Sequence, residues 1–176
     1  MNKITSELIK YRVTYLEMNN RPSFDWPKSL KCKLNILKAE NIPSWYFLFF
    51  YKQVGKKSYW TDWLDKTEKE LNNFVNDKNV IFYTLIKDGW PAGFFMLDYR
   101  VNKICNLSFL GLVEDAIGLG LGKYLLNTAI LTAWDSHKIE NLTVNTCSLD
   151  HKSSLQLYQK NVLLPVAFKT FEKHVL

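Results

Sequence analysis

The sequence predicts a mixed α/β (α+β, mixed-sheet) fold in which a mostly antiparallel central sheet is flanked by helices. Two observations carry this prediction. Short runs rich in β-formers, separated by turn residues, fill the middle of the chain. The almost wholly apolar run Leu107–Val113 then leads into glycine-rich Ile117–Lys123, after which apolar residues recur at helical spacing. A chain of 176 residues is most simply one domain, here 1–176.

The first part of the chain reads as strand, turn, strand and helix. Leu8–Met18 is rich in β-formers, and Lys31–Leu37 alternates polar and apolar residues in places. Pro43 suits the first turn of a helix over Ser44–Val54, which Gly55 would end.

A second helix and three strands are expected next. The D-x-x-E spacing of Asp65 and Glu68 predicts a capping box for a helix over Lys66–Val75. Asp88-Gly89 is a tight hairpin turn between the first two strands. The strands are expected at Val80–Ile86, Ala92–Tyr99 and Val101–Val113.

The last third is expected to cross over the sheet. A helix follows the glycines to about His137, and Asn141–Cys147 is a strand. Asp150 is a good N-cap for a helix through Lys160. Val166–Val175 closes the fold as a strand, so the order becomes strand–glycine loop–helix–strand–helix–strand.

Composition leaves several partners open. The formal charge is +6, from 23 Lys and Arg against 17 Asp and Glu, which suits nucleic acid, an anionic membrane, one polyanionic ligand or simple solubility. The three scattered cysteines form no CxxC pair, so we expect neither a disulfide framework nor a metal site. The longest apolar run, Trp45–Tyr51, is too short for a bilayer, which needs ~20 residues. With no signal-peptide pattern at the start, we expect a cytoplasmic protein with no membrane contact.

The glycines of Ile117–Lys123 are the strongest functional signal. Glycines at alternate positions before a helix let main-chain N–H groups approach a ligand, and a helix N-terminus favours phosphate. The spacing is neither a P-loop nor a good dinucleotide fingerprint. From spacing alone, phosphate binding and a structural turn both remain open.

Several strings resemble the GNAT superfamily of acyl-CoA N-acyltransferases. Leu110–Leu126 resembles its pyrophosphate motif Q/R-x-x-G-x-G/A, with Gly120 and Gly122 at the small positions. H-K-S-S-L-Q-L-Y-Q-K, residues 151–160, resembles its last-helix motif, with Tyr158 at the tyrosine. A bacterial branch is closer still, through Trp60-Thr61-Asp62, Ala92–Asp98, Leu110–Gly122 and Asn145–His151. The resemblance covers roughly residues 45–160, and residues 1–40 are unmatched.

The resemblance implies a GNAT-like fold and a site for acetyl-CoA, with no metal. The strand would hold the pantetheine arm, the glycine loop would cradle the pyrophosphate, and the residue before the last helix would also face the cofactor. The implied cofactor-binding residues are Leu110, Leu112, Ile117, Gly118, Leu119, Gly120, Leu121, Gly122, Lys123 and His151.

The chain also departs from the family pattern. Ile117 stands where the superfamily has Gln or Arg, and Leu119 stands where the branch has Arg. The loop therefore offers main-chain amides without a cationic side chain of its own, unless Lys123 compensates. Asn106 falls where the branch has a strand glutamate, so that candidate general base is absent.

The implied chemistry is attack of an amine on a thioester. Tyr158 is the candidate general acid for the leaving thiolate, against the alternative of a tyrosine packed on the core. His151 could cap the helix, touch the cofactor or act as a base. Trp60 and Asp62 could shape the acceptor pocket, with Asp62 attracting a cationic amine or instead forming a turn or cap.

A cluster of aromatic residues is large for one small core. Its members pack in the core, line an acceptor cleft or form a dimer contact. They are Trp45, Tyr46, Phe47, Phe49, Phe50, Tyr51, Tyr59, Trp60 and Trp63.

The leading hypothesis is an acetyl-CoA-dependent N-acetyltransferase, monomeric or homodimeric, that acts on an amine of a small molecule or peptide. A noncatalytic acyl-CoA-binding module is the second, because the loop arginine and the strand glutamate are missing. A nucleic-acid-binding protein ranks last, because the sequence has no basic helix or basic–aromatic repeat.

Overall fold

The computed structural model describes residues 7–28, 30 and 32–175, which form a seven-stranded sheet in the order β2-β3-β4-β5-β6-β1-β7. Neighbouring strands are antiparallel except β5 and β6, which are parallel. The predicted mixed, mostly antiparallel sheet is therefore confirmed. The strands are β1 Glu7–Met18, β2 Leu34–Ala39, β3 Val80–Lys87, β4 Trp90–Asp98, β5 Ile104–Leu112, β6 Asn141–Cys147 and β7 Leu164–Val175.

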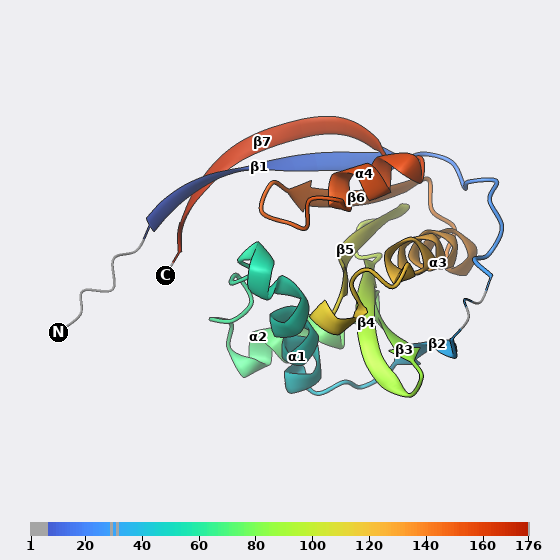
Figure 1. Cartoon of the computed structure of the whole chain (residues 1–176), viewed down its shortest axis with the longest axis horizontal. Coiled ribbons are helices and arrows are strands. Elements are labelled where there is room, and N and C mark those ends of the chain that lie inside the picture. The colour runs from blue at the N-terminus through green and yellow to red at the C-terminus, as the bar shows by residue number, and fades with distance from the viewer. Residues whose placement is uncertain (1–6, 29, 31, 176) are drawn as a thin grey trace.

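Helices cover both faces of the sheet. Successive side chains of β4 point to opposite faces, so neighbouring residues contact different helices. Phe94 lies 5.2 Å from Phe50 of α1, measured between ring centroids. Phe95 stacks on Tyr83, and at the end of β4 the hydroxyl of Tyr99 donates to the carbonyl oxygen of Ala133 in α3 at 3.4 Å. Figure 1 shows β4 and β5 between α1 and α2 on one side and α3 on the other. The helices are α1 Ser44–Gly55, α2 Glu68–Val75, α3 Leu121–Ser136 and α4 Ser154–Lys160, with 3₁₀ turns η1 Lys56–Ser58 and η2 Glu114–Ala116.

The hairpin between β3 and β4 has the predicted turn. Asp88 and Gly89 both take positive φ, 49° and 94°, as a two-residue type I′ turn requires. The residue types at positions 88 and 89 were therefore sufficient to predict this turn.

Two predicted helix caps are wrong. Thr67, not Asp65, caps α2: its hydroxyl accepts the N–H of Glu70, and the Glu70 carboxylate accepts the N–H of Thr67. The helix accordingly begins at Glu68 rather than at Lys66. Asp150 does not cap the last helix either, because α4 begins at Ser154 and the Asp150 carboxylate bonds elsewhere.

The two N-terminal strands separate to different parts of the sheet. β2 forms one edge beside β3, whereas β1 lies between β6 and β7. Lys31, the expected start of the second strand, lies outside the described residues, and the observed strand is shifted toward Ala39. Figure 1 shows β1 and β7 running together as a long curved pair above α1. We call this pair the β1–β7 arm.

The parallel pair β5–β6 is short, and this opens the sheet. Its register ends at the pairing of Asn106 with Thr143. A shift in the β4–β5 register then leaves Ser108 without a partner in β4, as a β-bulge does. Beyond this point β5 continues along β4 without β6, so one edge of β5 is free.

No helix among the described residues is long and apolar enough to cross a membrane.

We expect Gly93→Ala in β4 to destabilise the protein by about 1–3 kcal/mol, the usual cost of overpacking a core. An added Cβ would lie 2.6 Å from the carbonyl oxygen of Gly111, which is main chain and cannot rotate away. Urea denaturation measures the free energy of unfolding. Gly122→Ala is the matched control, because its Cβ meets only Leu157 at 3.6 Å and should cost nothing. Equal stability of the two variants would contradict the packing argument.

Candidate active-site cleft

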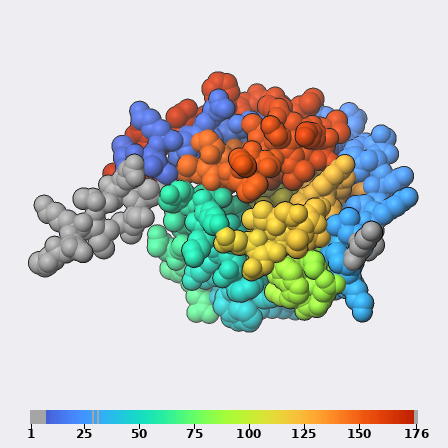
Figure 2. Space-filling view, viewed as in Figure 1, coloured from blue at the N-terminus to red at the C-terminus, as the bar shows by residue number. Residues whose placement is uncertain are grey.

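A cleft of about 680 Å³ opens where β5 and β6 part. Its walls come from β5, the glycine loop, α4, the segment that follows α1 and the β1–β7 arm. Figure 2 shows the face on which three of these surfaces meet, with the yellow glycine loop between the teal α1 region and the orange-red α4 region. The cleft thus joins segments that are far apart in the sequence.

The β5 wall offers unpaired main-chain groups. The N–H of Val113 donates to the carbonyl oxygen of Ala92 at 3.0 Å, so this residue faces β4. Because residues along a strand bond to alternate edges, Leu112 and Leu110 direct their main-chain groups to the free edge. Both residues line the cleft. The predicted positions 110 and 112 are therefore placed to bond an extended ligand.

The glycine loop presents main-chain donors at the start of α3. Gly118 and Gly120 have φ of 83° and 77°, which only glycine adopts without strain. A Cβ at either position would meet no atom within 4 Å, so the space in front of the loop is open. The N–H groups of residues 118–122 find no acceptor among the described residues. With the helix dipole behind them, such donors favour a negatively charged group.

The side chains around the loop are mostly apolar. Ile117 is 46 % exposed and Leu119 48 % exposed, and Leu119 does not line the cleft. Lys123 is exposed and does line it. Glu114, just before the loop, pairs with Lys57 and does not line the cleft. Any anion held here is held mainly by the main chain.

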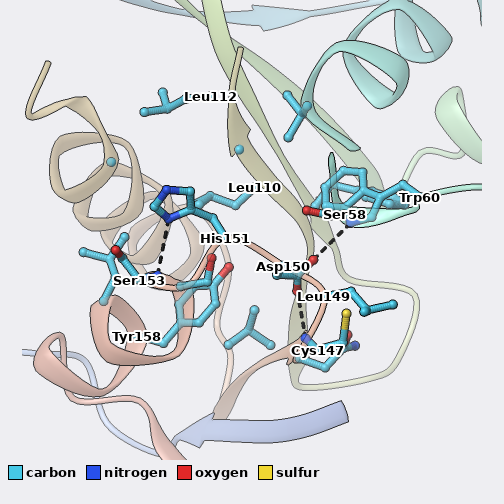
Figure 3. A pocket seen from close by; sticks show the side chains of 18 of the residues that line it. Ser58, Trp60, Leu110, Leu112, Cys147, Leu149, Asp150, His151, Ser153 and Tyr158 are labelled. Atoms are coloured by element: carbon cyan, nitrogen blue, oxygen red, sulfur yellow. Dashed lines mark hydrogen bonds between the residues drawn. The ribbon is translucent and has the colours of Figure 1, made fainter. Parts of the chain in front are cut away.

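Tyr158 projects from α4 into the cleft beside His151 and Asp150, as Figure 3 shows. Its ring is buried, and its hydroxyl has no hydrogen-bond partner among the described residues. Burial, and secondarily the charge of Asp150, raises the pKa of the Tyr158 phenol. Both effects favour the protonated form, so the phenol is kept as a proton donor.

Asp150 joins the two walls of the cleft. Its Oδ1 accepts the indole N–H of Trp60 at 3.2 Å, and its Oδ2 accepts the hydroxyl of Thr146 and the N–H of Cys147, both at 2.8 Å. Figure 3 shows it between Tyr158 on one side and Trp60 on the other. Sequence reasoning missed this role, because an aspartate before a helix is so commonly a cap.

The predicted acceptor residues Trp60 and Asp62 both line the cleft. Trp60 packs on Phe109 with 5.5 Å between ring centroids. Asp62 is 85 % exposed and lies at the rim, 3.9 Å from the ammonium of Lys173 in β7. Lys173 also donates to the carbonyl oxygen of Tyr59 at 2.7 Å, which ties the β1–β7 arm to the segment after α1.

His151 lies in the cleft lining and at the start of α4. Its Nδ1 accepts the N–H of Ser153 at 3.3 Å, and its carbonyl oxygen accepts the N–H of Ser154. The geometry supports a local capping contact, and the exposed ring remains free to meet a ligand.

The aromatic cluster divides between core and cleft. Phe47, Phe50 and Tyr51 are buried, and burial raises the pKa of Tyr51 to about 12. Tyr51 also reaches the cleft, together with Tyr59, Trp60 and Trp63. Trp45 stays 65 % exposed. Packing in the core is thus confirmed for part of the cluster, and other members line the cleft, whose role as an acceptor site stays a prediction.

Other cleft residues come from the β1–β7 arm, and their presence here could not be predicted from the sequence. Tyr11 and Val13 of β1 and Lys173 of β7 line the same space as β5. Only the non-local pairing of β1 with β6 and β7 brings them there, and no short motif signals such a pairing.

The family model for the acetyltransferase (GNAT) family matches residues 39–162, well over half of the chain. The chain therefore belongs to the acetyltransferase (GNAT) family, as its motifs predicted. No curated protein matches the chain significantly.

Solved structures share the fold at low sequence identity. A functionally unknown conserved protein from Staphylococcus epidermidis has a TM-score of 0.60 at 9% identity, covering 94% of this chain and 61% of that one. A GCN5-related N-acetyltransferase from Kribbella flavida has a TM-score of 0.59 at 12% identity, covering 92% and 56%. An aminoglycoside acetyltransferase from an uncultured soil metagenomic sample has a TM-score of 0.58 at 14% identity, covering 73% and 87%.

The chain spans less than two thirds of the length of the first two of these structures. The likeness establishes the GNAT fold. Among the described residues, no group of three or more His, Cys, Asp or Glu side chains could hold a metal ion.

We expect Asp150→Ala to cost about 1–3 kcal/mol of unfolding free energy, because it leaves the Trp60 indole and the Cys147 N–H without their acceptor. The intrinsic tryptophan fluorescence should change as well. Asp115→Ala, in an exposed turn, is the control and should alter neither quantity. An Asp150→Ala protein as stable as this control would show that the bridge does not hold the walls.

Proposed function

We propose that the protein is an N-acetyltransferase that moves an acetyl group from acetyl-CoA to a primary amine of a small molecule or peptide. Transfer takes place by direct attack within a ternary complex. One observation carries the proposal: the unpaired main-chain donors of Gly118 and of residues 120–122, the free edge of β5 and Tyr158 all border the same cleft. Family membership implies acyl transfer from acyl-CoA.

The site suits the donor substrate. The open, positive end of α3 fits a pyrophosphate, with Lys123 as the nearby cation of the loop. The main-chain groups of Leu110 and Leu112 fit the amides of a pantetheine arm. Ile117, Leu121 and His151 lie in the same lining and complete the donor half of the cleft. The thioester supplies an activated acyl carbon to this site.

The chain's own groups then act on the reacting atoms. A main-chain N–H of the free β5 edge polarises the carbonyl as negative charge builds on its oxygen. Tyr158 donates its proton to the departing sulfur as the C–S bond breaks. The nitrogen loses one proton as the C–N bond forms, and this proton returns to the phenolate through solvent, so the products are an amide and a free thiol. Trp60 and Asp62 form the part of the cleft that receives the amine. Asp62 attracts the amine in its ammonium form, and the ammonium group then loses a proton to solvent before it attacks.

Asn106 takes no part in this step. Its amide donates to the hydroxyl of Thr143 at 2.9 Å, and its oxygen accepts the hydroxyl of Ser108. It lines a second hollow rather than the main cleft. The proton of the amine must therefore pass to a group other than Asn106.

The free thiols of Cys32, Cys105 and Cys147 suit the reducing cytoplasm, where we place the enzyme as a monomer or homodimer. Neither nucleic acid nor a membrane is needed as a partner.

A noncatalytic acyl-CoA-binding module is the second candidate, favoured by the apolar side chains at Ile117 and Leu119. Thiol release from acetyl-CoA with a broad amine panel separates the two. Mass spectrometry of a metabolite extract supplied with labelled acetyl-CoA identifies any product. Binding of coenzyme A without turnover across the panel supports the module.

Gly120→Glu should weaken coenzyme A binding by more than about tenfold, because it places a carboxylate against the pyrophosphate. Isothermal titration calorimetry measures the affinity. Gly89→Glu is the matched control: it imposes the same change at another glycine of positive φ, in the β3–β4 turn outside the cleft. Unchanged affinity in Gly120→Glu would refute the role of the loop.

Tyr158→Phe should lower kcat by about 100-fold or more while the Kd for coenzyme A stays within roughly twofold. Because the folded protein raises the pKa of this phenol, the acid form persists as pH rises, and the wild type should show no alkaline decline below about pH 10. Tyr83→Phe, outside the cleft lining, is the control. A fully active Tyr158→Phe enzyme would remove this residue from the mechanism.

A further inference from the structure

We infer that the acceptor is an amine with one positive charge and a flat aromatic or apolar body, and that polycationic amines are disfavoured. This inference rests on the proposed acetyl transfer and names the substrate class of the same site. It follows from the rings and the charges at the end of the cleft remote from the glycine loop.

The remote end of the cleft is walled by rings. Figure 3 shows Cys147 and Leu149 at the end opposite Leu112, with Trp60 beside them. Trp60 lies 5.4 Å from Tyr51 and 5.5 Å from Phe109, measured between ring centroids. Such surfaces hold aromatic and apolar groups by area burial and ring contacts.

Tyr11 continues this wall on the β1–β7 arm. It stacks on Phe171 of β7 at 5.8 Å and faces the cleft. Asp62 and Cys147 line the same cleft as Tyr11, and burial, followed by the charge of Asp62, raises the pKa of Tyr11. An acceptor at this end would therefore lie between Trp60 and Tyr11, with Asp62 at its rim.

The charges at this end nearly cancel. The cleft lining contains two aspartates, Asp62 and Asp150. The Asp150 carboxylate is occupied by Trp60, Thr146 and the Cys147 N–H. Asp62 remains, and it already pairs with Lys173. One ammonium group can still approach Asp62, because its side chain is 85 % exposed, but a second finds no other exposed carboxylate in the cleft lining.

Lys173 adds a repulsive element. Its side chain is only 18 % exposed, and its ammonium is held in place by the carbonyl oxygen of Tyr59. A fixed, partly buried cation at the rim disfavours every additional positive charge on an acceptor. Specificity of this kind is obtained by repelling the wrong ligand as well as by attracting the right one.

The test compares 2-phenylethylamine with spermidine and kanamycin in the thiol-release assay at saturating acetyl-CoA. The value of kcat/KM should be at least about tenfold higher for 2-phenylethylamine. A preference for spermidine or kanamycin, or equal use of all three, would overturn the inference.

Lys173→Met removes the repulsion and frees the Asp62 carboxylate. The ratio of kcat/KM for spermidine to that for 2-phenylethylamine should rise by roughly fivefold. Lys169→Met is the matched control: it makes the same change in β7, four residues earlier and outside the cleft lining, and should keep the ratio of the wild type. An equal shift in both variants would refute the role of Lys173.

Calorimetric titration of 2-phenylethylamine and of spermidine into the protein with coenzyme A separates this inference from the proposed function. Selective binding of 2-phenylethylamine without turnover supports the acceptor class and contradicts acetyl transfer. Turnover that prefers spermidine supports acetyl transfer and overturns the acceptor class. If 2-phenylethylamine neither binds nor reacts, the acceptor class is wrong.

Discussion

The parting of β5 from β6 is the constraint on which the site depends. The two strands pair only as far as Asn106 and Thr143, and beyond that point Leu110 and Leu112 keep main-chain groups without a partner strand. Unpaired main-chain groups in a closed interior would cost free energy. They are tolerated because the edge faces an open cleft, where water or a ligand can satisfy them. The opening that leaves the sheet unpaired here is therefore also what makes these main-chain groups accessible from the cleft.

Hydrogen bonds made by two side chains, Asp150 and Lys173, connect the opened walls. Asp150 bonds Trp60 from one wall and the turn after β6 from the other, and Lys173 ties β7 to Tyr59. The same Asp150 charge acts on Tyr158, whose pKa is raised mainly by burial and further by that charge. One carboxylate thus contributes to both the shape of the cleft and the protonation of its candidate acid, so changes at position 150 affect both.

Features set by neighbouring residues could be predicted from the sequence. The Asp88-Gly89 turn and the glycine loop before α3 follow from residues that need positive φ, and both are found where expected. Ambiguity arose where two residues offered the same chemistry: Asp65 and Thr67 both precede a helix, and the structure uses Thr67. Tyr11 and Lys173 could not be predicted as cleft residues, because their position depends on strand pairing between opposite ends of the chain.

The charge of the cleft changes along its length. At the glycine loop, main-chain donors, a helix N-terminus and Lys123 all favour a polyanion. At the other end, the negative charge of Asp62 is offset by Lys173 among aromatic rings. In the proposed reaction, a nucleotide thioester would bind at one end and an amine would have its favourable contacts at the other. Because the two proposed ligands would not compete for the same groups, both would fit in the cleft together, which is the arrangement that direct transfer requires.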